Sequence, residues 1–250
     1  MTTAVSRLRM FAGPNGSGKS TIKTKIPSGW LGDYINPDEI QQEIRVLESV
    51  NLEAHEIQST TDEVVSFFEQ SDLWKSTGLL HAASHVEMKD GKLVFMNITN
   101  DSYIASISAD FIRQKLLRQK ASFTFETVMS HPDKVALLEK AKDLGYRTYL
   151  YYIATEDSAI NISRVKYRVE HTGGHSVPED KITTRYKRSL ELLMDAIRHT
   201  NRAYIFDNSR DGSDNSILIA EITEGRDIVL KYDPMPAWFK RTVWDKVRPI

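Results

Sequence analysis

The residues best suited to chemistry in this sequence form a glycine-rich stretch, residues 13–20, which reads Gly-Pro-Asn-Gly-Ser-Gly-Lys-Ser. The spacing matches G-x-x-x-x-G-K-[ST], a loop that binds the phosphates of nucleotides. Glycines allow a tight backbone turn whose N–H groups point inward at phosphate oxygens. The Lys19 amine is expected to reach the β- and γ-phosphates, and the Ser20 hydroxyl to bind Mg²⁺. The sequence therefore predicts a nucleoside triphosphate site, with ATP and Mg²⁺ as cofactors.

The residues that flank this stretch supply the setting that a phosphate loop requires. Residues 8–12 predict a short strand and residues 20–26 predict the start of a helix, which gives a strand–loop–helix unit. The amino end of that helix directs the positive end of its dipole at a bound anion. The predicted nucleotide contacts are Gly13, Asn15, Gly16, Ser17, Gly18, Lys19, Ser20 and Thr21.

The composition of the chain excludes several classes of protein. A formal net charge of −1 over 250 residues gives no general affinity for nucleic acids or acidic membranes. The absence of cysteine excludes disulfides and thiolate metal sites. No apolar run approaches the roughly 18 residues of a membrane helix, and residues 1–9 are too polar for a signal peptide. A soluble cytoplasmic protein is the expectation.

Predicted strands and helices alternate along most of the chain. The strands are expected at residues 8–12, 34–36, 93–98, 122–125, 147–153 and 203–207. Such alternation is typical of an α/β protein with a mostly parallel sheet and helices on both faces, here the three-layer fold of P-loop NTPases. We expect one domain over residues 1–250, in which residues 46–109 form a helical insertion or cap. Residues 214–250 are expected to form an extension with a C-terminal β-hairpin.

Polar clusters follow the predicted strands at the points where they end. These clusters are the phosphate loop, Asn36 with Asp38, Glu126 with Thr127, and Asp207 with Asn208. Ligands of parallel sheets bind beyond the carboxyl ends of the strands, so the clusters should converge. Asp38 is the candidate base for an acceptor hydroxyl, and Asn36, Glu126 and Thr127 are candidate acceptor contacts. The alternative for Asp38 and Glu126 is an acid at a helix start or a turn.

Two arginines of adjacent predicted helices are candidates for phosphate binding. Arg168 and Arg185 lie at the edges of apolar helix faces, whereas Arg164 and Arg188 lie further round. A guanidinium group binds phosphate oxygens in a bidentate manner. Because Arg168 and Arg185 bracket Gly173-Gly174, we expect a mobile lid. The alternative is that each is a solvated surface charge.

Five ordered blocks give the sequence a resemblance to a known family. They are residues 12–21 (AGPNGSGKST), 35–40 (INPDEI), 123–130 (FTFETVMS), 173–178 (GGHSVP) and 185–190 (RYKRSL). On these blocks the sequence resembles the zeta-toxin-like family of P-loop kinases, over about residues 7–45 and 110–208. Residues 46–109 and the C-terminal hairpin lie outside the shared blocks.

The resemblance implies a fold like that of nucleoside monophosphate kinases and a role for several residues. It implies phosphorylation of a sugar hydroxyl of UDP-N-acetylglucosamine, with Asp38 as the base. Glu126 and Thr127 match the acceptor-binding segment of the family. Arg168 and Arg185 match lid arginines that contact ATP phosphates, and Arg164 is a further adenine or phosphate contact. Any neutralising antitoxin is expected to be a separate protein.

The sequence thus predicts a kinase that transfers phosphate from Mg²⁺-ATP to a hydroxyl of a small acceptor, foremost a nucleotide sugar. One alternative is a nucleotide-gated interaction protein in which residues 46–109 bind a protein partner. Asp38 counts against it, because a switch needs no base at the acceptor. A second alternative is a nucleic-acid or nucleotide kinase, which the near-neutral charge disfavours.

Overall fold

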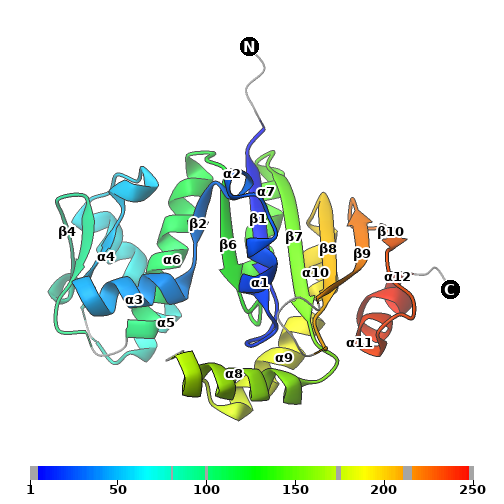
Figure 1. Cartoon of the computed structure of the whole chain (residues 1–250). Helices are drawn as coiled ribbons and strands as arrows, with labels where there is room; N and C mark the ends of the chain where they lie inside the picture. The colour runs from blue at the N-terminus through cyan, green and yellow to red at the C-terminus, as the bar shows by residue number, and fades with distance from the viewer. Residues whose placement is uncertain (1–4, 80, 99–100, 173–175, 211–215, 248–250) are drawn as a thin grey trace. The chain divides into compact units, whose positions relative to one another are not determined.

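The computed structural model of the chain describes residues 5–79, 81–98, 101–172, 176–210 and 216–247 (Figure 1). The chain divides into two compact units. The first unit combines residues 1–32 with residues 124–250, and the second comprises residues 33–123. The segment 46–109 lies wholly within the second unit.

The first unit carries the sheet that the sequence predicts. Its strands are β1 (Arg7–Ala12), β6 (Phe123–Thr127), β7 (Arg147–Ala154), β8 (Arg202–Asp207), β9 (Ile217–Thr223) and β10 (Asp227–Leu230). Its helices are α1 (Lys19–Thr24), α2 (Ser28–Leu31), α7 (Asp133–Asp143), α8 (Ser158–Thr172), α9 (Glu179–Glu191), α10 (Leu193–Arg198), α11 (Ala237–Phe239), η3 (Lys240–Trp244) and α12 (Asp245–Val247).

The strands of this unit lie in the order β10-β9-β8-β7-β1-β6. β1, β7 and β8 pair in parallel, and β9 and β10 add antiparallel strands at one edge. Helix α1 lies on one face of the sheet, with α7 and α10 on the other (Figure 1). The predicted fold class, a mostly parallel sheet covered by helices with a C-terminal hairpin, is confirmed. The hairpin also extends the main sheet, because β9 pairs with β8.

Buried side chains on both faces explain why these strands are central. Residues 8, 10, 11 and 12 of β1 are fully buried, as expected for a parallel strand covered on two sides. On the α1 face, Phe11 stacks on Tyr151 with ring centroids 4.7 Å apart, and Tyr151 stacks on Tyr204 at 5.1 Å. Ile22 of α1 packs into the same cluster. This stack joins three parallel strands beneath the helix that follows the phosphate loop.

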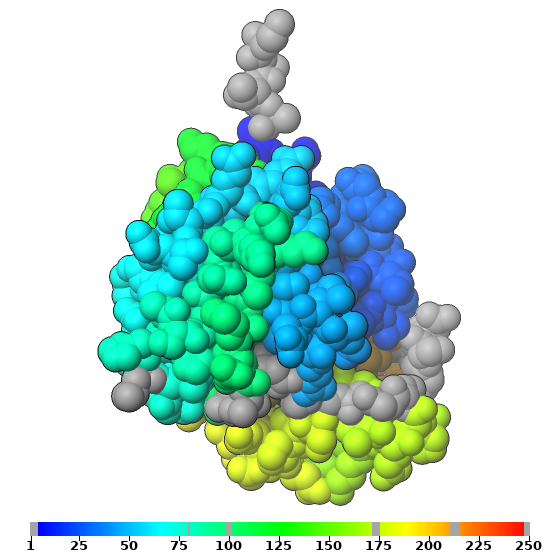
Figure 2. Space-filling view, turned by 90° about the vertical axis from the view of Figure 1, so that its left-hand side faces the viewer, coloured from blue at the N-terminus to red at the C-terminus, as the bar shows by residue number. Residues whose placement is uncertain are grey.

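The second unit combines helices with a small antiparallel sheet. Its elements are β2 (Asp33–Ile35), α3 (Pro37–Leu47), β3 (Ser49–Asn51), η1 (Glu53–His55), α4 (Thr61–Gln70), α5 (Asp72–Ser76), η2 (Ala82–Ser84), β4 (Val86–Lys89), β5 (Lys92–Phe95) and α6 (Asp101–Arg118). The sheet has the order β3-β5-β4. Figure 2 shows the blue, cyan and blue-green segments of this unit as one continuous surface.

The predicted strand at residues 93–98 corresponds to β5, which begins at Lys92 and ends at Phe95. The sequence did not predict β3 and β4, so a purely helical insertion was an incomplete description. Asn36 caps the next helix, because its side chain accepts a hydrogen bond from Asp38 N at 3.0 Å. Pro37 occupies the first turn of α3, where its missing N–H costs nothing.

No helix within the described ranges combines the length and the apolarity that crossing a membrane would require.

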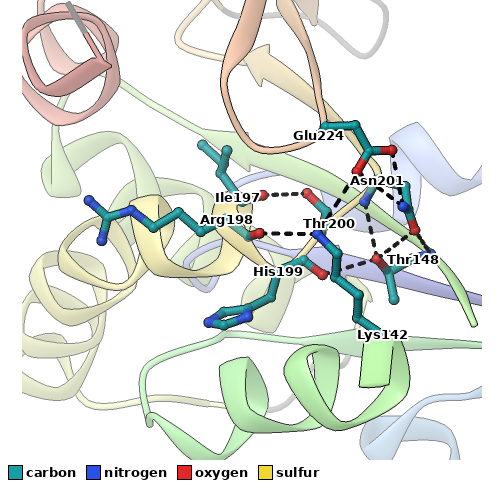
Figure 3. Close-up of polar contacts among 8 residues, drawn as sticks. All are labelled: Lys142, Thr148, Ile197, Arg198, His199, Thr200, Asn201 and Glu224. Carbon is teal, nitrogen blue, oxygen red and sulfur yellow. Dashed lines mark hydrogen bonds and ion pairs between the residues drawn. The ribbon is translucent and has the colours of Figure 1, made fainter. Parts of the chain in front are cut away.

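A polar network connects the amino ends of β7 and β8 in the main sheet (Figure 3). Asn201 accepts a hydrogen bond from Thr148 N at 2.9 Å and donates to Glu224 Oε1 at 3.1 Å. Lys142 lies 3.9 Å from the second carboxylate oxygen of Glu224. This network lies at the amino ends of β7 and β8, whereas the phosphate loop follows the carboxyl end of β1.

The C-terminal helices are anchored to the end of β8 by one buried side chain. Trp238 of α11 is fully buried, and its indole N–H donates to Asp207 Oδ1 at 2.7 Å. The same carboxylate oxygen accepts a hydrogen bond from Ser209 Oγ at 2.7 Å. The sequence did not predict this anchor, because the two residues are far apart along the chain.

We predict that Trp238→Phe destabilises the protein by about 1–3 kcal/mol, because the buried Asp207 carboxylate loses a donor. Denaturant unfolding followed by circular dichroism measures this change. Trp30→Phe is the matched control: Trp30 is 61% exposed, so its free energy of unfolding should change by less than about 0.5 kcal/mol. Equal effects of the two substitutions would contradict the anchoring role of Trp238.

Candidate phosphate-binding site

The phosphate loop joins the end of β1 to the start of α1 in the first unit. Gly13 N donates to Thr127 O at 3.3 Å, which ties the loop to the end of β6. Gly18 caps α1 with a φ of +97°, a conformation that disfavours side chains. A Cβ atom at Gly18 would collide with Asn208 Nδ2, and one at Gly13 would collide with the carbonyl oxygen of Ile153. Neighbouring groups therefore approach the loop so closely that only glycine fits at these positions.

The amine of Lys19 is held inside this loop. Lys19 Nζ donates to Gly13 O at 2.9 Å and to Pro14 O at 3.2 Å. It lies 3.9 Å from Glu126 Oε1, and the two side chains are only 9% and 11% exposed. The structure thus brings together two residues that the sequence predicted at separate strand ends. A cation in this position is suited to bind phosphate oxygens.

Two asparagine side chains donate hydrogen bonds to backbone carbonyl groups of the loop. Asn161 of α8 donates through Nδ2 to Asn15 O at 2.6 Å, and Asn208 donates through Nδ2 to Ser17 O at 2.8 Å. Asn208 stood out in the sequence as a polar residue at a strand end, but its contact with the loop was not predicted. Asn161 was missed. The sequence offered one signal: Asn161 lies four residues before Val165, on the same face of the helix. In the structure Asn161 is fully buried.

The predicted arginines occupy different positions in the first unit. Arg164 is half-buried and donates to Asn208 O at 2.7 Å and to Arg210 O at 2.8 Å, next to the loop that follows β8. Arg168 of α8 is exposed, and Arg185 of α9 is half-buried. Residues 173–175, the predicted apex of the lid, lie outside the described residues. Helices α8 and α9 lie beyond the carboxyl ends of β1 and β7 (Figure 1).

One tyrosine anchors α9 next to the end of β7. Tyr186 is buried, and its hydroxyl donates to Thr155 O at 2.7 Å. Burial raises the pKa of Tyr186 to about 12, and the negative charges of Glu156 and Asp157 act in the same direction. The phenol therefore remains a hydrogen-bond donor at neutral pH. This bond fixes the helix that carries Arg185.

The remaining predicted contacts lie on both units. In the first unit, Ser20 is exposed in the first turn of α1, Thr21 is half-buried, and Thr127 Oγ1 accepts a hydrogen bond from Met129 N at 3.0 Å. In the second unit, Asp38 is exposed in the first turn of α3, next to its cap Asn36. The contact of Asn36 and Asp38 with an acceptor stays a prediction.

The site geometry fits a nucleotide with its metal ion. Within the described ranges, no group of three or more histidine and acidic side chains is arranged to hold a metal ion. Mg²⁺ usually binds through one or two protein ligands together with phosphate oxygens and waters. A hydroxyl at Ser20 beside a phosphate loop satisfies that requirement without an all-protein cage.

Comparison with protein families gives a match that covers three of the five sequence blocks, at residues 123–130, 173–178 and 185–190. Residues 103–214 match the family model described as Zeta toxin, so the predicted resemblance is confirmed. An uncharacterized protein from Haemophilus influenzae is 33% identical over 70 residues, which cover 28% of this chain and 49% of that relative.

Solved structures with a similar fold include two of AvrRxo1-ORF1 in complex with AvrRxo1-ORF2. The structure with sulphate ions has a TM-score of 0.54 at 16% identity, and the structure with ATP has a TM-score of 0.53 at 15% identity. In both cases the alignment covers 97% of this chain and 63% of the other. At this level of identity the likeness shows the fold.

We predict that Gly18→Ala abolishes nucleotide binding, because the new methyl group meets Asn208 Nδ2 and the residue must keep a positive φ. Isothermal titration of Mg²⁺-ATP measures this loss. Gly145→Ala is the control, because it strains the backbone without causing a steric collision. Gly145 has a φ of +85°, and no atom lies within 4 Å of the place that its new methyl group would take. The control should lose stability and keep its affinity; a similar loss of affinity in both variants would contradict the prediction.

Proposed function

We propose that this chain is an ATP- and Mg²⁺-dependent kinase that phosphorylates a hydroxyl group of a small acceptor. The observation that carries the proposal is the Lys19 amine, which is buried in a glycine loop beside Glu126. A P-loop alone indicates phosphate binding. The resemblance to zeta toxins in residues 103–214 supports transfer of the phosphate rather than binding alone.

The loop residues would bind the triphosphate and leave its terminal phosphate accessible to an acceptor. The Lys19 amine already points at carbonyl oxygens of the loop, and phosphate oxygens are stronger acceptors because they are charged. Bound Mg²⁺, held on the protein side by Ser20, would neutralise negative charge on the phosphates. Asn15, Thr21 and the loop amides would complete the cradle.

Asp38 would orient the acceptor hydroxyl and accept its proton. Its exposed carboxylate is available, and the hydrogen bond from Asp38 N to Asn36 fixes the turn that carries it. Glu126 and Thr127 would contact the acceptor at the end of β6, together with Asn36. Arg168 and Arg185 would stabilise the charge that develops on the transferred phosphoryl group, and Arg164 would contact the donor nucleotide.

For the acceptor we propose a nucleotide sugar such as UDP-N-acetylglucosamine, on the strength of the family resemblance. Residues 46–109 would then act as a cap of the acceptor pocket within a single kinase domain. A separate antitoxin protein would be the partner. The solved AvrRxo1 structures, which contain two different proteins, support a two-protein arrangement by analogy.

We predict that Asp38→Asn lowers the rate of phosphoryl transfer by about 10²- to 10⁴-fold with ATP affinity unchanged, because the acceptor loses its general base. The measurement is ³¹P NMR of the protein with Mg²⁺-ATP and a panel of nucleotide sugars, nucleosides and cofactors. The control is Asp62→Asn, which removes another exposed acid from the first turn of a helix, α4.

A new phosphomonoester signal that Asp38→Asn lacks and Asp62→Asn retains would support the kinase and identify its acceptor class. Transfer at the wild-type rate by Asp38→Asn would overturn the proposed base. Tight ATP binding without transfer to any acceptor would instead favour the nucleotide-gated interaction protein.

We also predict that Arg185→Ala lowers kcat by about 10²-fold, because one preorganised cation is lost from the transition state. Arg188→Ala is the matched control on the same helix, since Arg188 is exposed and Arg185 is half-buried. Steady-state kinetics with the acceptor found by ³¹P NMR compare the two. Equal kcat values for both variants would contradict the proposed role of Arg185 in stabilising the transferred phosphoryl group.

A further inference from the structure

The asparagine that follows β8, Asn208, donates a side-chain hydrogen bond to the backbone of the phosphate loop. We infer that Asn208 is a positioning residue of the nucleotide site, which holds the Ser17–Gly18 peptide group so that Gly18 N–H points at bound phosphate. The inference rests on the proposed function, and it assigns a role that neither the loop motif nor the family match specifies.

The direction of the Gly18 N–H group follows from one hydrogen bond. Asn208 Nδ2 donates to Ser17 O at 2.8 Å, so this carbonyl group points toward Asn208. The Ser17–Gly18 peptide is trans, and in a trans peptide the C=O and N–H bonds point in opposite directions. Gly18 N–H is therefore directed away from Asn208, to the inner side of the loop.

Asn208 is itself fixed from two other elements. Its N–H donates to Ala154 O at the end of β7 at 2.8 Å, and its carbonyl oxygen accepts a hydrogen bond from Arg164 of α8 at 2.7 Å. The residue is only 8% exposed. A side chain on such a fixed backbone is a preorganised donor, so little conformational entropy is lost when it binds the loop.

Asn208 fits the loop in space at Gly18 as well as through its hydrogen bond to Ser17 O. The missing Cβ at Gly18 leaves the room that the Asn208 amide nitrogen occupies. Glycine is also the residue whose backbone rotates most freely. Without the Asn208 donor, the Ser17–Gly18 peptide would sample other orientations, and nucleotide binding would have to select the correct one.

Asn161 orients a peptide group in the preceding part of the loop in the same way. Asn161 Nδ2 donates to Asn15 O at 2.6 Å, so Gly16 N–H is directed away from α8. Asn161 is fully buried and also bonds Thr155, so its replacement would disturb folding. Asn208 is therefore the better residue to test.

The experiment compares Asn208→Asp and Asn208→Ala with the wild type, using ADP as the ligand so that no acceptor is needed. Isothermal titration gives the Kd for Mg²⁺-ADP, and thermal melting gives the Tm of each protein without nucleotide. We expect Asn208→Ala to weaken ADP binding at least about tenfold, the size of one lost hydrogen bond. Asn208→Asp should weaken it further, because its carboxylate repels phosphate.

The matched control is Asn201→Asp in the polar network at the amino ends of β7 and β8 (Figure 3). This variant loses the donor to Glu224 and brings two carboxylates together, so its Tm should fall. Its Kd for ADP should stay within about twofold of the wild-type value, since Asn201 lies at the amino ends of the strands and the phosphate loop at their carboxyl ends. A lower Tm with a normal Kd in the Asn208 variants would overturn the inference, because it would show a purely structural role.

A measurement on the wild type keeps the inference testable if the variants do not fold. With ¹⁵N-glycine labelling, ADP should shift the Gly18 and Gly16 amide resonances more than that of Gly145. Unchanged Gly18 and Gly16 resonances in an ADP-saturated protein would overturn both the inference and the proposed loop contacts, whereas the Asn208 variants test the inference alone. Failure of the wild type to bind either ADP or ATP would overturn the inference and the kinase proposal.

Discussion

The burial of a charged amine inside a loop of backbone is the constraint on which the rest of the site depends. Lys19 Nζ has to reach the carbonyl oxygens of Gly13 and Pro14, so the loop must curl tightly around it. Tight curling in turn excludes side chains where the loop touches β7 and the residue after β8. The close packing of Phe11, Tyr151 and Tyr204 keeps those strands in register beneath the loop.

Much of this arrangement could be predicted from the sequence, because its determinants are local. The loop motif, the alternation of apolar strands with helices, and the Asn36 cap of α3 each depend on residues that are neighbours in the chain. The convergence of strand ends followed from a general rule of parallel sheets, and it correctly brought Glu126 to Lys19.

What the sequence did not predict depends on contacts between distant residues. Asn161 and Asn208 support the loop from two elements that lie far along the chain, and an isolated asparagine carries no periodic signal. The strands β3 and β4 were missed because strands of three or four residues show no alternating pattern, and neither contains the run of apolar residues that indicated β5. The position of Arg164 was also unexpected, since helical periodicity describes the packing of a face and not its hydrogen-bond partners.

The charges around the amine explain how the site can be both stable and ready for phosphate. A buried amine is costly unless it is paired, and Glu126 compensates its charge from 3.9 Å. That distance is too long for a hydrogen bond, whereas the carbonyl oxygens of Gly13 and Pro14 lie within hydrogen-bond distance of the amine. Phosphate oxygens form stronger, charge-assisted bonds than carbonyls do, so we expect a phosphate to compete with these carbonyl groups for the amine. In the proposed kinase, a bound phosphate would share the charge of this amine with Glu126, the carboxylate at the end of β6 that we propose as an acceptor contact.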